Sequence, residues 1–182
     1  MPLFVFGEQM IGLLEFNPEE PEENEQPRKA CGAVGSYIHA GGKIGVLVEV
    51  SCETEFGARS DHFQSLIKDI AMQVAATSPM FIRKDDVTLE AYEKEREIYR
   101  AQCTAAGKLE PVIEKIVEGK MSKFYETACL MEQPFVKEPS ITVAQLIQNY
   151  INKLGEHISV RRFARFKVGD ADETFGSQQS RI

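Results

Sequence analysis

The stretch Lys43-Ile-Gly-Val-Leu-Val-Glu-Val-Ser-Cys-Glu-Thr-Glu-Phe-Gly-Ala-Arg-Ser60 decides the fold that we expect for this chain. Its first half places a β-branched side chain at every second position, and this period of two predicts a strand with one strongly apolar face. After a short polar segment, Ser60 and Asp61 are suited to cap a helix. The apolar positions of that helix recur at the spacing of one buried face: Phe63, Leu66, Ile67, Ile70, Ala71 and Val74.

Between this strand and this helix lies the segment Thr54-Glu55-Phe56-Gly57, in which an aromatic residue stands between a carboxylate and a glycine. Glycine tolerates tight bends, so such a segment can present a phenyl ring outward. The alternative is that Phe56 closes the end of the core, which is the more common outcome for its residue type. Both interpretations stay open at this point.

Two further segments are expected to join the strand in a sheet. Gly41-Gly42 separates it from an earlier strand, and both glycines tolerate the positive φ of a hairpin turn. If these two residues form the loop, Tyr37 pairs with Val46 and His39 with Ile44. A third strand is predicted over residues 158–168, where the period of two returns with an apolar side made of Ile158, Val160, Ala164, Phe166 and Val168.

Helices account for most of the remaining chain. We expect a charged helix from Leu89 to about Ala106 with a solvated face, and a helix that starts near Pro111 and bends at Gly119 before a further helical stretch. Another helix is capped by Ser140 or Thr142 and ends at Gly155. The sequence therefore predicts an α+β fold, in which helices cover a small antiparallel sheet made of the hairpin and the C-terminal strand.

Composition bounds the domain organisation and the function. A chain of 182 residues with 43% hydrophobic and 27% charged residues predicts one soluble domain, which we place at residues 31–169. Residues 1–30 read as an acidic, proline-rich tail or linker, and residues 170–182 as a polar tail. The net charge of −7 argues against a nucleic-acid binder, and no apolar run is long enough to span a membrane.

No pattern typical of an enzyme, a metal site or a cofactor site is present in the sequence. There is no phosphate-binding glycine loop and no recognisable nucleophile motif. The cysteines and the histidines, His39, His62 and His157, are too widely spaced for a zinc site. We expect the four cysteines to be buried free thiols: Cys31, Cys52, Cys103 and Cys129.

Several motifs together resemble one known family. The run from Gly35 to Ala76, and the later segments Glu114-Lys-Ile-Val-Glu-Gly-Lys120, Glu132-Gln-Pro-Phe-Val-Lys137 and Arg161-Arg-Phe-Ala-Arg-Phe166, closely resemble the core domain of bacterial elongation factor Ts in collinear order. The resemblance implies a guanine-nucleotide exchange factor for the GTPase elongation factor Tu.

The resemblance also implies which residues bind the partner. In that family the segment between strand and helix reads Thr-Asp-Phe-Val, and its aromatic side chain enters the GTPase near the magnesium and phosphate site. The matching residues here are Thr54, Glu55, Phe56 and Gly57, and His39 is a candidate for a further contact. The alternative is that His39 is a residue at the rim of the sheet without a functional role, which is the more common outcome for a histidine in such a place. Glycine in place of valine predicts a looser turn, and hence weaker exchange than in typical members.

Further expectations follow from the family. Short members work as homodimers in the cytoplasm, without a cofactor. Most members begin with a compact three-helix domain, which residues 1–30 do not resemble. The alternative function is a non-catalytic interaction module, which binds the GTPase or a larger assembly without accelerating exchange.

Overall fold

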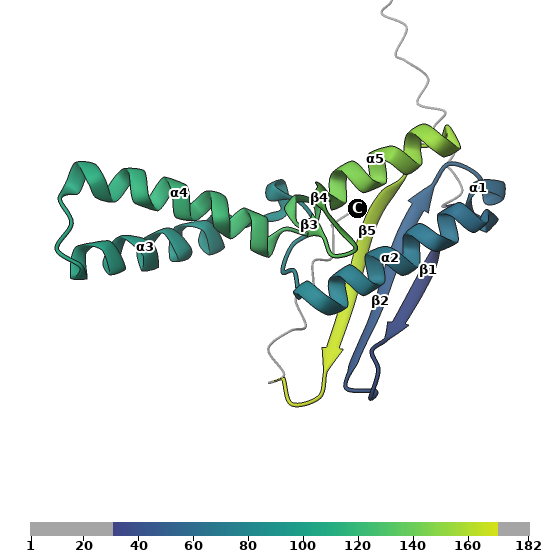
Figure 1. The fold of residues 1–182 in the computed structure, drawn as a ribbon, viewed down its shortest axis with the longest axis horizontal. Helices are drawn as coiled ribbons and strands as arrows, with labels where there is room; N and C mark the ends of the chain where they lie inside the picture. Colours follow the sequence, from purple (N-terminus) through teal and green to yellow (C-terminus); the bar gives the residue numbers. More distant parts are fainter. Residues whose placement is uncertain (1–30, 171–182) are drawn as a thin grey trace, which may run out of the picture.

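The computed structural model of the protein describes residues 31–170. Three strands form its main sheet in the order β1-β2-β5, with both neighbouring pairs antiparallel (Figure 1). Their bounds are β1 (Cys31–Ile38), β2 (Ile44–Cys52) and β5 (Ser159–Lys167). The predicted α+β class and the composition of the sheet are confirmed. The tails predicted at residues 1–30 and 170–182 lie outside the described residues, except for Asp170.

The hairpin between β1 and β2 has the predicted register. Tyr37 pairs with Val46, and the backbone N–H of His39 donates to the carbonyl oxygen of Ile44 at 2.9 Å. The loop is longer than two glycines, because the strands end at Ile38 and resume at Ile44. Gly41 and Gly42 take φ values of 89° and 68°, which fits their predicted place in the turn.

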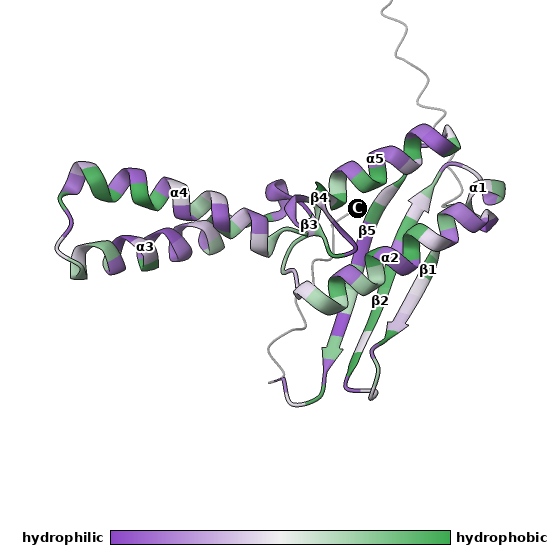
Figure 2. Cartoon of the chain, in the orientation of Figure 1, coloured by the Kyte–Doolittle hydropathy of each residue, from purple (hydrophilic) through white to green (hydrophobic). Residues whose placement is uncertain are grey.

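Two helices, α2 (Asp61–Thr77) and α5 (Val143–Leu154), lie across one face of this sheet (Figure 1). Ser60 caps α2, while Thr142 and Gln145 form a capping box at the start of α5. All six predicted apolar positions of α2 are buried, and they pack on the alternate valines of β2. Figure 2 shows β2 as largely hydrophobic along its length. The alternation in the sequence therefore locates the core correctly.

Strand β5 corrects one prediction. Glu49 pairs with Arg162 whereas Val50 pairs with Val160, so Arg161 is an extra residue in a β-bulge. A bulge reverses the sides to which later residues point. Phe163 consequently packs against the core, and Phe166, expected on the apolar side, is 54% exposed on the other face. The predicted placement of Ala164 and Phe166 toward the core is wrong.

The face of the sheet that points away from α2 and α5 carries a row of apolar side chains. Ile38 and Phe166 flank Gly45 in adjacent strands, and Leu47 lies in the next row between Ser36 and Ala164. We call this surface the open sheet face, and its large exposed hydrophobic residues are Val34, Ile38, Leu47 and Phe166. An ion pair between Arg162 and Glu49, 2.5 Å between Nε and Oε2, ends it on one side.

Helices α3 (Leu89–Ala105) and α4 (Glu110–Ala128) form a hairpin that projects away from the sheet (Figure 1). Helix α4 runs through Gly119 without interruption, so the predicted bend is wrong. Ile113, Val117 and Met121, spaced by one helical turn, pack with Cys103 into a small core that keeps α4 continuous.

The charged positions of α3 are also not simply a solvated face. The guanidinium of Arg100 pairs with Glu114 at 2.5 Å and also with Glu110, and Arg96 reaches Glu114 at 3.4 Å. These pairs join α3 to α4 across the hairpin.

A two-stranded ribbon, β3 (Pro134–Phe135) with β4 (Glu138–Thr142), connects this hairpin to α5. Two short 3₁₀ turns, η1 (Lys84–Asp86) before α3 and η2 (Leu130–Glu132) after α4, are joined by an ion pair between Lys84 and Glu132. Within residues 31–170 no helix combines the length and the apolar character needed to cross a membrane.

Candidate partner-binding site

The segment after β2 is a short helix, α1 (Glu55–Arg59), rather than a bend. Thr54 caps it, since its Oγ1 accepts a hydrogen bond from the backbone N–H of Gly57 at 2.9 Å. Ser60 joins α1 to α2: its Oγ donates to the Gly57 carbonyl oxygen at 2.8 Å and accepts from the N–H of Phe63 at 3.2 Å. Both ends of α1 are thus held by side-chain hydrogen bonds.

Phe56 lies on the outer side of α1 and is 85% exposed. The interpretation in which this ring closes the end of the core is therefore wrong. Ala58, on the same short helix, is buried and packs into the main core. Burial of Ala58 orients α1 so that Phe56 faces solvent, and an exposed phenyl ring is available to a partner.

Gly57 has a different role from the one that we expected. It lies inside α1, it is buried, and its backbone N–H is bonded to Thr54. The looser turn that glycine predicted is not found. A Cβ atom built at position 57 would lie 2.2 Å from Oε2 of Glu156, so the glycine leaves room for that carboxylate.

Glu156 is the residue of this site that sequence reasoning missed. It follows α5, yet its carboxylate accepts a hydrogen bond from the backbone N–H of Thr54 at 3.2 Å and from Oγ1 of Thr54 at 2.5 Å. Burial and the negative charge of Glu156 raise the pKa of the neighbouring Cys52 thiol. Cys52 is accordingly a neutral, weakly nucleophilic group beside the site.

The cysteines as a set differ from the expectation in one respect. All four are free, but only Cys103 and Cys129 are buried. Burial first, and then the charge of Glu132, raise the pKa of the Cys129 thiol to about 11. Cys31 and Cys52 are half-buried and stand opposite each other in β1 and β2.

His39 does not join the other predicted site residues. It lies at the hairpin turn next to Ile44, whereas α1 follows the opposite end of β2, about 25 Å away at about 3.3 Å per strand residue. Its Nδ1 is 3.2 Å from the hydroxyl of Tyr37. His39 and Phe56 therefore belong to separate parts of the surface.

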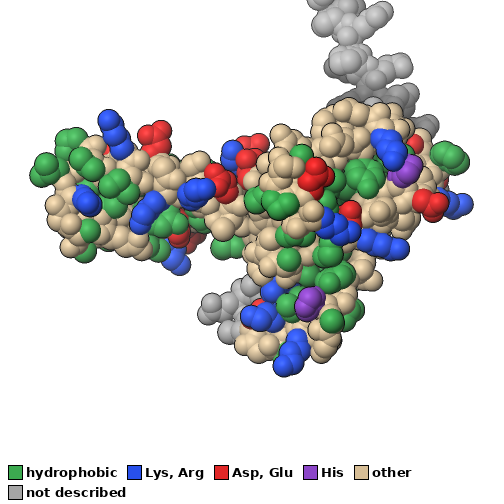
Figure 3. All heavy atoms as spheres, in the orientation of Figure 1, with side chains coloured by type: hydrophobic (Ala, Val, Ile, Leu, Met, Phe, Trp, Pro, Cys, Tyr) green, Lys and Arg blue, Asp and Glu red, His purple; other side chains and the backbone are tan. Residues whose placement is uncertain are grey.

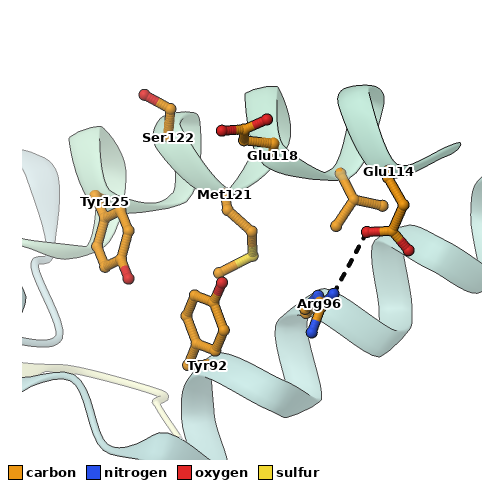
Figure 4. A pocket seen from close by; sticks show the side chains of 8 residues that line it. Tyr92, Arg96, Glu114, Glu118, Met121, Ser122 and Tyr125 are labelled. Atoms are coloured by element: carbon orange, nitrogen blue, oxygen red, sulfur yellow. Dashed lines mark hydrogen bonds and ion pairs between the residues drawn. The ribbon is translucent and has the colours of Figure 1, made fainter. Parts of the chain in front are cut away.

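Two clefts lie away from this site. One, of ≈ 550 Å³, opens between α3 and α4, where the charge of Arg96 is paired with Glu114 (Figure 4). The other, of ≈ 610 Å³, lies beside β3 and is lined by Phe135 and Val136 among others. Over residues 31–170, no three histidine, cysteine or acidic side chains are grouped to hold a metal ion.

Surface charge does not single out another site on the face that carries α2 and α5. Figure 3 shows basic and acidic side chains interspersed on this face, along the α3–α4 hairpin as well as over the sheet domain. Such a mixture is typical of a solvated surface and gives no continuous basic strip for nucleic acid.

Comparison with known proteins gives one family. The sequence profile described as Elongation factor TS matches residues 24–170. The chain is 66% identical over 143 residues to the elongation factor Ts of Koribacter versatilis, covering 79% of this chain and 65% of that protein. It is 60% identical to that of Solibacter usitatus and 59% identical to that of Geobacter sulfurreducens, covering 77% and 78% of this chain and 66% of each relative. The chain thus spans just under two thirds of the length of these curated relatives.

Proposed function

The chain belongs to the elongation factor Ts family, and from this premise we propose that it is a cytoplasmic guanine-nucleotide exchange factor for elongation factor Tu. Phe56 is the side chain that enters the GTPase near its magnesium and phosphate site, Glu55 and Gly57 lie beside it in the helix that presents it, and Thr54 caps that helix. The observation that carries the proposal is the 85% exposure of a phenyl ring on a helix held at both ends.

Linkage explains how such a ring promotes release. A partner that binds the nucleotide-free GTPase more tightly than the GDP-bound form must weaken GDP by the same coupling free energy. Full burial of a phenylalanine side chain contributes about 1.5–3 kcal/mol. If this free energy offsets the displacement of the groups that hold magnesium and phosphate, GDP is released roughly 10- to 100-fold faster.

The proposed exchange no longer has to be weaker than that of members with valine at position 57. A loose turn is no longer a cause of weaker exchange, because α1 is held by Thr54 and Ser60. Nor would valine at position 57 offer a partner more apolar area, because that position is buried and a Cβ atom there would lie 2.2 Å from Oε2 of Glu156. Glycine at this position therefore gives no reason to propose weaker exchange.

Release of labelled GDP from elongation factor Tu tests this function against the alternative. The full chain, added in increasing amounts, is expected to accelerate release until the rate saturates. Binding to the GTPase with no acceleration would reject exchange and favour the non-catalytic interaction module. Neither binding nor acceleration would reject both functions.

We also propose that two copies of the chain associate through the open sheet face. Val34 and Ile38 of β1, Leu47 of β2 and Phe166 of β5 expose an apolar surface that three strands share, which is uncommon on a protein that stays monomeric. A two-fold axis brings the same surface of both copies together, so that each contact between two residues occurs twice.

Leu47→Lys is expected to weaken this dimer by about tenfold or more, because it places a charge in an apolar interface. Sedimentation equilibrium of the wild type should give twice the chain mass of 20.4 kDa at micromolar concentration. Leu89→Lys, which changes an exposed leucine on the α3–α4 hairpin, is the control and should leave the dimer unchanged. A monomeric wild type, or equal dissociation of both variants, would reject the proposed interface.

A further inference from the structure

Glu156 reaches α1 from a distant part of the chain. It follows Gly155, which ends α5 in the left-handed conformation at φ 70°. The carboxylate receives two hydrogen bonds from Thr54, at 3.2 Å from the backbone N–H and at 2.5 Å from Oγ1. Since that same Oγ1 accepts from the N–H of Gly57 at 2.9 Å, one chain of hydrogen bonds connects Glu156 to the first turn of α1.

The space around Gly57 gives a second, independent observation. A Cβ atom there would lie 2.2 Å and 2.5 Å from the two carboxylate oxygens of Glu156. The backbone conformation does not require glycine, because the φ of Gly57 is not positive. Glycine at position 57 and glutamate at position 156 therefore fit as a pair, and any larger residue at 57 must displace the carboxylate.

We propose that Glu156 is a positioning residue that fixes the start of α1, and with it the direction of the Phe56 ring, before the partner binds. The inference rests on the proposed function of Phe56. An exposed ring on a mobile helix must lose its freedom when it enters a pocket, and this opposes binding. Charge-assisted hydrogen bonds from Thr54 remove that freedom in the unbound protein.

In this role Glu156 stabilises α1 and contributes little to the main core. The residue is half-exposed, it accepts hydrogen bonds from Thr54, the cap of α1, and its carboxylate lies beside Gly57 within α1. Loss of its carboxylate should free α1 and leave the remaining fold intact. Amide hydrogen exchange, resolved by residue, measures this directly in the absence of any partner.

Glu156→Ala is expected to lower the exchange protection of the Gly57 and Ala58 amides by about fivefold or more, the effect of removing a charge-assisted hydrogen bond. Protection in α2 and β2 should stay unchanged. With elongation factor Tu, the concentration of chain that gives half-maximal GDP release should rise by a similar factor, while the maximal rate changes less. Glu156→Gln retains one acceptor and should recover part of both effects.

Glu53→Ala is the matched control, because it removes a neighbouring exposed carboxylate that precedes Thr54. Gly57→Ala should reproduce the loss of protection seen with Glu156→Ala, and should add little to it when the two are combined, because both remove the same contact. Unchanged protection in Glu156→Ala, a loss spread evenly over α2 and the sheet, or additive effects of the two substitutions would each overturn the inference.

The two proposals fail in different ways. If the wild type does not accelerate GDP release, the proposed function is rejected, and the hydrogen-exchange results still decide whether Glu156 holds α1. If the wild type is active and Glu156→Ala matches it in protection and in half-maximal concentration, only the positioning role is rejected.

Discussion

Gly35→Val should lower the free energy of unfolding by at least about 3 kcal/mol, the upper range for overpacking a core. The reason is the close approach of β1 to α2, since a Cβ atom at Gly35 would lie 1.9 Å from Cγ2 of Ile67. Ile67 is itself buried in the main core, so neither side can move away without opening the contact between sheet and helix.

Urea unfolding followed by circular dichroism measures this effect. Gly119→Ala is the control: nothing lies within 4 Å of its added Cβ, and alanine in a helix interior should raise stability by up to about 1 kcal/mol. If Gly35→Val were as stable as the wild type, the packing of α2 on β1 described above would be incorrect.

Gln73→Leu should cost about 2–4 kcal/mol of folding free energy, because it leaves buried polar groups without partners. The Gln73 side chain is fully buried. Its Oε1 accepts from the backbone N–H of Val136 at 2.8 Å, and its Nε2 donates to Gln133 Oε1 and to the Pro134 carbonyl oxygen, both at 3.1 Å. Leucine has a similar volume but satisfies none of these groups.

The same unfolding experiment checks Gln73→Leu. Gln148→Leu on the exposed side of α5 is the matched control and should change stability by no more than about 0.5 kcal/mol. Equal losses from the two substitutions would show that the amide network linking α2 to β3 contributes nothing specific.

The sequence predicted the centre of this fold well, because local periodicity and core position coincide there. Val46, Val48 and Val50 alternate in an uninterrupted strand, and α2 keeps one apolar face from Phe63 to Val74. Periodicity failed at Arg161, where a bulge shifts the pattern by one residue and turns Phe166 outward. The one local sign of the bulge is Arg162, a charged residue at a position where the period of two would place an apolar one.

The remaining differences also have physical causes. Gly119 suggested a bend, but packing of α4 on α3 outweighs the low helix propensity of one glycine. At the candidate site, the sequence predicted Phe56 and its neighbours as site residues but gave no indication of Glu156. The two segments are about a hundred positions apart, and only the fold places the end of α5 beside α1.

The rate of GDP release from elongation factor Tu with the Phe56→Ala chain tests the central claim most directly. Leu89→Ala, which removes another exposed apolar side chain from the α3–α4 hairpin, serves as the control and should match the wild type. We expect Phe56→Ala to lose roughly 10- to 100-fold of the acceleration, in proportion to the buried area that the ring would contribute. Release as fast with Phe56→Ala as with the wild type would contradict that claim.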